Sequence, residues 1–308
     1  GNLIINATES IDIVGTTTPD GQGPSGLSAS VISGATGDAG DILILTQRLT
    51  ARDGGAIIAS NFGTGQTGFV KVNASELIEL LGNESSSINV SAGVDATGQS
   101  GALEISTQRL IIEDGSSILA VTFGEADAAD VLIRATDSVT ISGSNAENSF
   151  SSAITTESLF FPEFRGQGNA GLGRGGDIEI RTGALNLSNE GVLSSAATGL
   201  GASGNINLFI DDSIEIDNAG ISTTSEQSSG GQIAISAGNI RLLNDGDITT
   251  NVNVGQGGGG NIAIQSDFII VLDDSDILAF ALEGIGGEID LSQTILFSQN
   301  LNPVVEGL

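Results

Sequence analysis

Residues 41–55 read DILILTQRLTARDGG, and this stretch decides the fold. Apolar residues occupy every second position from Ile42, again from Leu49, and a third time from Ile57, after a pair of glycines. Alternation with a period of two is typical of β-strands that bury one face. Glycines permit the tight corners that separate such strands. The stretch and its continuation therefore predict three short strands joined by corners.

The phrase that opens this stretch, a glycine usually followed by Asn or Asp and then by alternating apolar residues, returns along the whole chain. Its copies begin at Gly1, Gly40, Gly68, Gly101, Ala129, Gly176, Gly204, Gly231, Gly260 and Gly287, which we number as the starts of coils 1 to 10. Repeats of 20–50 residues indicate a solenoid or a propeller, but a propeller blade needs four strands in 40–45 residues. We therefore predict an all-β parallel β-helix, with three short strands in each of about ten coils.

The coils cover residues 1–298 as one domain, and residues 299–308 break the alternation, so we expect a partial cap or an irregular tail there. The fourth residue after each leading position is aliphatic in every coil and should point inward. These residues are Ile5, Ile44, Val72, Ile105, Ile133, Ile180, Leu208, Ile235, Ile264 and Leu291.

Even and odd coils differ in sequence. Even coils resemble residues 102–116, ALEISTQRLIIEDGS, and span 28 or 29 residues. Odd coils resemble residues 69–82, FVKVNASELIELLG, and span 27 to 47 residues. The unit of repetition is thus a pair of coils, and insertions fall in the odd coils, above all at residues 16–26 and 157–175.

Composition restricts the partners and the chemistry. The chain has 38 acidic and nine basic residues, a net charge of −29, which disfavours nucleic acids and anionic membranes. No apolar run approaches the ~20 residues of a membrane span. His, Cys, Tyr and Trp are absent, so histidine acid–base catalysis, thiolate metal sites and disulfides are excluded. The chain begins inside a repeat, and we expect it to be a piece of a longer protein.

Several motifs carry a family resemblance: the NASESIxIxG-like odd coils, the IxTQRLxxxDGxxIxAxxFG-like even coils, and residues 22–30 (QGPSGLSAS), 60–68 (SNFGTGQTG) and 274–287 (DSDILAFALEGIGG). Together they resemble filamentous haemagglutinin-type exoproteins, in particular those of cyanobacteria. The resemblance implies a right-handed β-helix, which agrees with the usual hand of parallel crossovers. It also implies two-partner secretion through an outer-membrane transporter and an extracellular adhesin. The family's NPNG- and NPNL-like secretion motifs are missing.

Two acidic features are candidate metal sites. Asp273, Asp274 and Asp276, which we name the acidic turn, offer the hard oxygen ligands that suit Ca²⁺, but they lack EF-hand spacing. A column of Asp and Asn thirteen residues after the leading position is better explained by turns that need a left-handed backbone. Its members are Asp53, Asp114, Asn189, Asp217, Asn244 and Asp273. We predict no cofactor and keep calcium at the acidic turn as a hypothesis.

The insertion at residues 157–175 is the strongest candidate for a binding loop. It combines Phe160, Phe161 and Phe164 with Arg165 and Arg174, an aromatic and locally basic group in an acidic chain. Such a group suits an interaction surface. The alternative is that the phenylalanines fold back onto a coil as a small satellite core.

We expect a non-catalytic, structural and adhesive shaft that is secreted or held at the cell surface. Its partners would be a host or neighbouring-cell surface or an extracellular polysaccharide. Two alternatives stay open: a polysaccharide-active β-helix lyase or hydrolase that uses paired carboxylates, and an extracellular fibre subunit that associates end to end through open strand edges.

Overall fold

The structure is a computed structural model of the 308-residue chain, and it describes residues 1–15, 25–82, 84–96, 100–145, 150–160, 171–254 and 258–299. These ranges contain twenty strands and no helix. One sheet is formed by β1 (Leu3–Asn6), β2 (Ser10–Val14), β4 (Ile42–Arg52), β6 (Val70–Leu81), β8 (Ala102–Glu113), β10 (Asp130–Ser142), β12 (Ile178–Ser188), β14 (Ile206–Asp217), β16 (Ile233–Leu243), β18 (Ile262–Val271) and β20 (Ile289–Ser298). The other is formed by β3 (Gly26–Ser28), β5 (Ala56–Ile58), β7 (Ser87–Ala92), β9 (Ser117–Thr122), β11 (Ala153–Ser158), β13 (Val192–Ala197), β15 (Gly220–Ser225), β17 (Asp247–Val252) and β19 (Ile277–Ala281).

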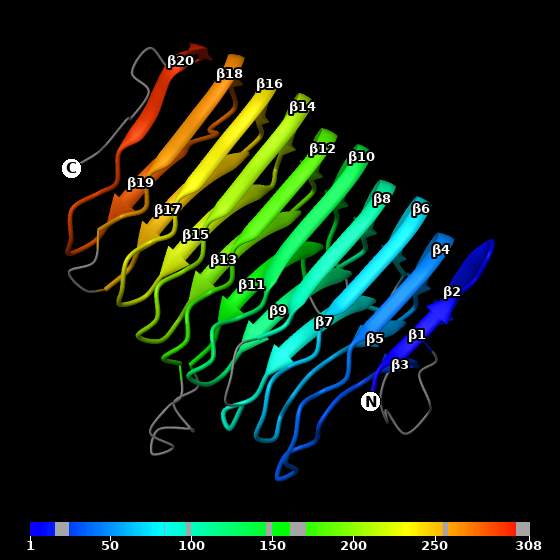
Figure 1. The fold of residues 1–308 in the computed structure, drawn as a ribbon. Coiled ribbons are helices and arrows are strands. Elements are labelled where there is room, and N and C mark those ends of the chain that lie inside the picture. Colours follow the sequence, from blue (N-terminus) through cyan, green and yellow to red (C-terminus); the bar gives the residue numbers. More distant parts are fainter. Residues whose placement is uncertain are drawn as a thin grey trace.

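The chain winds into a parallel β-solenoid of about nine turns, which confirms the predicted fold class. Every ladder between named strands is parallel, and each strand pairs with the equivalent strand of the next coil. Figure 1 shows the long strands side by side in chain order, with the short strands stacked in the same order along the other sheet. We call these the long-strand sheet and the short-strand sheet.

The first two strands predicted for each coil run together in the structure. From coil 2 onward they form one strand of 10 to 13 residues, whereas coil 1 keeps β1 and β2 apart. A register shift marks the former boundary: the pairing passes from Ala135 to Ser138 in an odd coil while the even neighbour passes from Thr182 to Ala184. The odd coil thus carries one extra residue, a β-bulge, and coils 3 and 7 share it, whereas odd coil 9 pairs with coil 8 without a register shift.

This bulge corrects the predicted turn column. Five of its six members have a left-handed backbone, with φ between 50° and 56°. The sixth, Asp217, lies in coil 7, which has the bulge, and there the left-handed residue is Asn218, with φ 50°; Asp273 lies in coil 9, which lacks the bulge and keeps the predicted position. The extra residue of the bulge moves the turn one position along the chain.

The predicted inward column is confirmed. Eight of its ten side chains are at most 3% exposed, and Ile5 and Leu291, in the first and last coils, are partly buried against the same core. The core is therefore one continuous stack of aliphatic layers along the solenoid. It supplies the hydrophobic stabilisation that lets the outer surface vary.

The recurring Gly-Asx phrase has a direct structural reason. A methyl group on any of the stacked leading glycines from Gly40 to Gly287 would lie 1.8–2.1 Å from the carbonyl oxygen of the preceding coil's leading residue. The neighbouring Asx oxygen accepts a hydrogen bond from the next coil, as when Asp177 Oδ1 accepts from the Asn205 N–H at 2.7 Å. Both positions join successive coils.

The short-strand sheet buries a column of hydroxyl groups that the sequence did not lead us to expect. Thr156, Ser195, Thr223 and Thr250 are Cα partners on successive strands, and all four are fully buried. Thr156, Thr223 and Thr250 donate to glycine carbonyls at 2.6–2.8 Å. These bonds satisfy backbone oxygens that would otherwise be buried without a partner.

Candidate functional site

The predicted binding loop is only partly within the described residues. Phe161, Phe164 and Arg165 lie outside them. Phe160 follows β11, is half-buried, and donates its backbone N–H to Thr198 Oγ1 at 2.7 Å. Arg174 is exposed and lines a groove in which Phe160 takes no part. Glu157, the first residue of the predicted loop, belongs to β11.

The acidic turn is exposed, and its backbone explains its composition. Asp273 and Asp274 have φ of 54° and 61°, and the Asp276 N–H donates to Asp247 Oδ1 at 2.9 Å. Within the described ranges no three acidic side chains are grouped so that they could hold a metal ion. The structure therefore offers a turn and a coil-to-coil bond at these positions.

A groove of about 900 Å³ lies along one edge of the solenoid, and we name it the edge groove. Phe69 and Ala102 line it, and they follow the leading glycines of coils 3 and 4 at the position where most coils have Asp or Asn. Lys71 enters the groove and pairs with Glu104 at 2.6 Å. Carboxylates outnumber the cations in its lining, so the groove is acidic.

One carboxyl in the edge groove has a perturbed pKa. Burial raises the pKa of Asp130, the hydrogen bond from the Asp177 N–H at 2.8 Å opposes the rise, and the Asp177 charge adds to it. A shifted carboxyl beside a second carboxylate is also a feature of glycosidases. However, burial raises the pKa of Asp247 in the same way beside Asp276, outside this groove. Both carboxyls accept the backbone N–H of an aspartate in the next coil, so the shift accompanies this coil-to-coil bond and does not single out a reactive pair.

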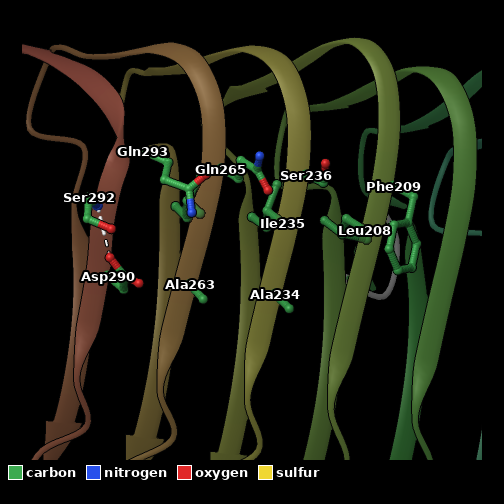
Figure 2. Close-up of a pocket in the computed structure, with 11 residues that line it drawn as sticks. Leu208, Phe209, Ala234, Ile235, Ser236, Ala263, Gln265, Asp290, Ser292 and Gln293 are labelled. Atoms are coloured by element: carbon green, nitrogen blue, oxygen red, sulfur yellow. Dashed lines mark hydrogen bonds between the residues drawn. The ribbon is translucent and has the colours of Figure 1, made fainter.

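A second candidate lies on the outer face of the long-strand sheet. Phe209 separates two recesses there, one of about 260 Å³ towards β20 and one of about 320 Å³ towards β10. Figure 2 shows the first recess, with Ala234 and Ala263 on the strands between Phe209 and Asp290. Small side chains on the middle strands leave the space, and larger ones bound it. We name the two recesses together the face trough.

The face trough follows a single column of outward side chains, one from each of six successive coils. Its members are Arg134, Arg181, Phe209, Ser236, Gln265 and Gln293, each the Cα partner of the next, and we name them the outer column. All six are exposed. Figure 2 shows the last four on successive strands. The outer column thus presents cationic, aromatic and amide groups in order along the solenoid axis.

Contacts at its two ends define the chemistry of the trough. The Arg181 guanidinium lies 3.9 Å from the centroid of the Phe209 ring, a cation–π contact, and its Nε pairs with Glu179 at 2.8 Å. At the other end, Asp290 accepts a hydrogen bond from the Ser292 N–H at 2.9 Å, and bonds to Ser292 lower the pKa of Asp290. The trough therefore has a cationic end and an anionic end.

Sequence reasoning missed the trough because its residues are far apart in the chain and form no local motif. The available signal was the fifth position after each leading residue, where a column of Asn, Leu and Ser changes to Arg, Arg and Phe.

Comparison with protein-family models, with curated proteins and with solved structures finds no match to this chain. None of the described segments forms a helix with the length and hydropathy required to cross a membrane.

Proposed function

We propose that this chain is a non-catalytic, structural and adhesive shaft of an extracellular protein, held on or released from the cell surface, that contacts polysaccharide or another cell. The observation that carries this proposal is the face trough, an exposed series of recesses along the outer face of a continuous β-solenoid. The buried aliphatic core stabilises the solenoid whatever side chains point outward, so the outward side chains can be used to contact a partner.

The motifs of the odd and even coils support a finer proposal. They resemble filamentous haemagglutinin-type exoproteins, and we infer export by two-partner secretion through an outer-membrane transporter. The net charge of −29 agrees with a partner other than nucleic acid. Arg174, which lines the edge groove, supports a second contact region at the insertion of residues 157–175.

The competing enzymatic function depends on carboxylate pairs such as Asp130 and Asp177. The side chain of Asp130 already accepts the Asp177 N–H, and the same arrangement recurs at Asp247 and Asp276. The absence of His and Tyr from the chain removes two common acid–base groups. These facts favour binding over turnover.

The test is to measure retention of the purified chain on immobilised extracellular polysaccharides and on intact cells, and to assay released sugar ends in the same samples. We expect saturable retention without release of new ends. Release of reducing or unsaturated ends would establish the enzymatic alternative. Failure to be retained on any of these surfaces would refute the adhesive role, and light scattering that rises with protein concentration would instead favour the fibre subunit.

A further inference from the structure

We propose that the face trough binds a linear oligosaccharide that carries an isolated carboxylate group, such as one uronate among neutral sugars. Arg134 and Arg181 hold the carboxylate, Phe209 packs against the adjoining sugar, and the amides of Gln265 and Gln293 bind hydroxyl groups further along. This inference rests on the proposed adhesive function and names its ligand.

The pair of arginines is the first argument. Arg134 and Arg181 are direct Cα partners on β10 and β12, and like charges directly opposite one another destabilise a sheet. Arg181 has Glu179 as its ion-pair partner, whereas Arg134 has no carboxylate within ion-pair distance among the described residues. In a chain with 38 acidic residues, an unpaired arginine next to another arginine leaves a local site for an anion. Guanidinium groups match the planar geometry of a carboxylate.

The position of Phe209 is the second argument. Its side chain is 39% exposed, yet Arg181 holds the ring in place by lying over it. The same ring bounds the recess of Figure 2, where Ala234 and Ala263 leave room for a ring-shaped ligand. An exposed aromatic ring fixed at the wall of such a recess can pack against the apolar C–H face of a sugar.

The spacing of the outer column is the third argument. Neighbouring strands lie ~4.8 Å apart, so each coil advances a side chain by about the length of one sugar in an extended glycan. Ser236, Gln265 and Gln293 continue the column beyond Phe209 with hydroxyl and amide groups. These groups both donate and accept hydrogen bonds, as recognition of sugar hydroxyls requires.

The carboxylates in and beside the trough limit the ligand to few negative charges. Asp290 lines the recess opposite Phe209, and its carboxylate repels a second uronate while accepting hydrogen bonds from hydroxyls. Glu179 and Asp211 add negative charge beside the arginines, and the whole chain carries −29. A densely charged polyanion is therefore disfavoured. One carboxylate, placed at the arginine end, fits the trough.

The test is calorimetric titration of the whole chain with three probes: a tetrasaccharide that carries one glucuronate, the same tetrasaccharide after reduction of its carboxyl group, and tetragalacturonate. We expect the singly charged probe to bind at least tenfold more tightly than the other two. The double variant Arg134→Gln/Arg181→Gln should lose that tenfold preference and leave binding of the reduced probe unchanged. Phe209→Ala should weaken binding of both the singly charged tetrasaccharide and its reduced form.

Arg241→Gln is the matched control, because Arg241 lies on β16 of the same sheet but pairs with Glu215 at 3.3 Å and does not line the trough. Circular dichroism checks that each variant is folded. Equal binding by the wild type and the double variant would overturn the proposal, and so would an equal loss in Arg241→Gln. If the trough variants are still retained on polysaccharides like the wild type, this site is refuted and the adhesive function is not. If the wild type itself is not retained, the adhesive function is refuted.

Discussion

Replacing Gly204 with alanine should weaken the stack of coils 6 to 8. The new methyl carbon would lie 2.0 Å from the carbonyl oxygen of Gly176, and such a carbon needs at least 3.0 Å. The two coils must therefore separate by about 1.0 Å at this corner. Ala129 occupies the equivalent position in coil 5, so a methyl group in this column is compatible with folding and the variant should fold.

The size of the effect follows from the bonds beside the corner. Ile178 donates its N–H to Asn205 O at 2.8 Å across the same interface, and a separation of 1.0 Å would break that hydrogen bond. A lost backbone hydrogen bond costs ~1 kcal/mol net. Residual overpacking adds ~1–3 kcal/mol. We expect the free energy of unfolding to fall by ~2–4 kcal/mol.

Gly220→Ala is the matched control. The nearest atom to its new methyl carbon is Asp247 O at 4.0 Å, and its backbone needs no left-handed conformation. Alanine at a compatible glycine position stabilises by ~0.4–1 kcal/mol through the unfolded chain. Urea unfolding followed by circular dichroism gives both values, and hydrogen exchange localises the change, because a long repeat array need not unfold in one step. If Gly204→Ala matches the wild type, or if both variants lose equally, close approach of the coils does not explain the glycine column.

Three further predictions concern other parts of the solenoid. Thr223→Val removes a 2.8 Å hydrogen bond to Gly231 O without leaving a cavity, so the free energy of unfolding measured in urea should fall by ~1–3 kcal/mol. Thr224→Val, on the outward side of the same strand, is the control and should change it by less than about 0.5 kcal/mol. Equal effects of the two variants would contradict a stabilising role of the buried hydroxyl column. Burial raises the pKa of Glu157, so this carboxyl stabilises the folded state while protonated, and that contribution is lost as the pH rises from the ordinary carboxyl range through the raised folded-state value. In thermal melts from pH 4 to pH 8, the melting temperature of Glu157→Gln should therefore fall less steeply with pH than that of the wild type. Parallel curves for the two proteins would contradict this prediction. Calorimetric titration of the chain with Ca²⁺ should show no binding at the acidic turn, because its carboxylates are not grouped around a common point in the described residues. A one-to-one binding isotherm that disappears when its three aspartates are replaced with asparagine would instead support the calcium hypothesis.

The sequence was sufficient for the fold because the fold repeats a local rule. Alternation at Ile42 and Ile44 specifies a strand, the glycine spacing specifies the coil, and the stacked Asx residues specify the turns. It was not sufficient for the strand count per coil. The alternation after Thr46 resumes without a breaking residue, so only the geometry of the ladder reveals that β4 passes through a register shift.

The odd–even difference illustrates the same limit. The sequence showed two kinds of coil, and the structure adds that odd coils 3, 5 and 7 hold one more residue in their long strands, while coil 9 does not. One inserted residue would reverse the facing of every later side chain in a flat strand. The bulge absorbs it, so that Ile214 of coil 7 and Ile240 of coil 8 remain Cα partners in the core. Asp217 was misassigned because its offset was counted as if this residue were absent.

The candidate site was unpredictable for a reason that is specific to solenoids. The insertion of residues 157–175 breaks the period, and the sequence points there first because loops on a rigid scaffold commonly bind. In this fold, however, an outward side chain contributes little to the core, and a surface substitution commonly changes stability by less than about 0.5 kcal/mol. Any outward column can therefore acquire binding groups without disturbing the period. Arg181 and Phe209 are adjacent in space and 28 residues apart in the chain, so the sequence order that identifies the scaffold separates the residues of the site.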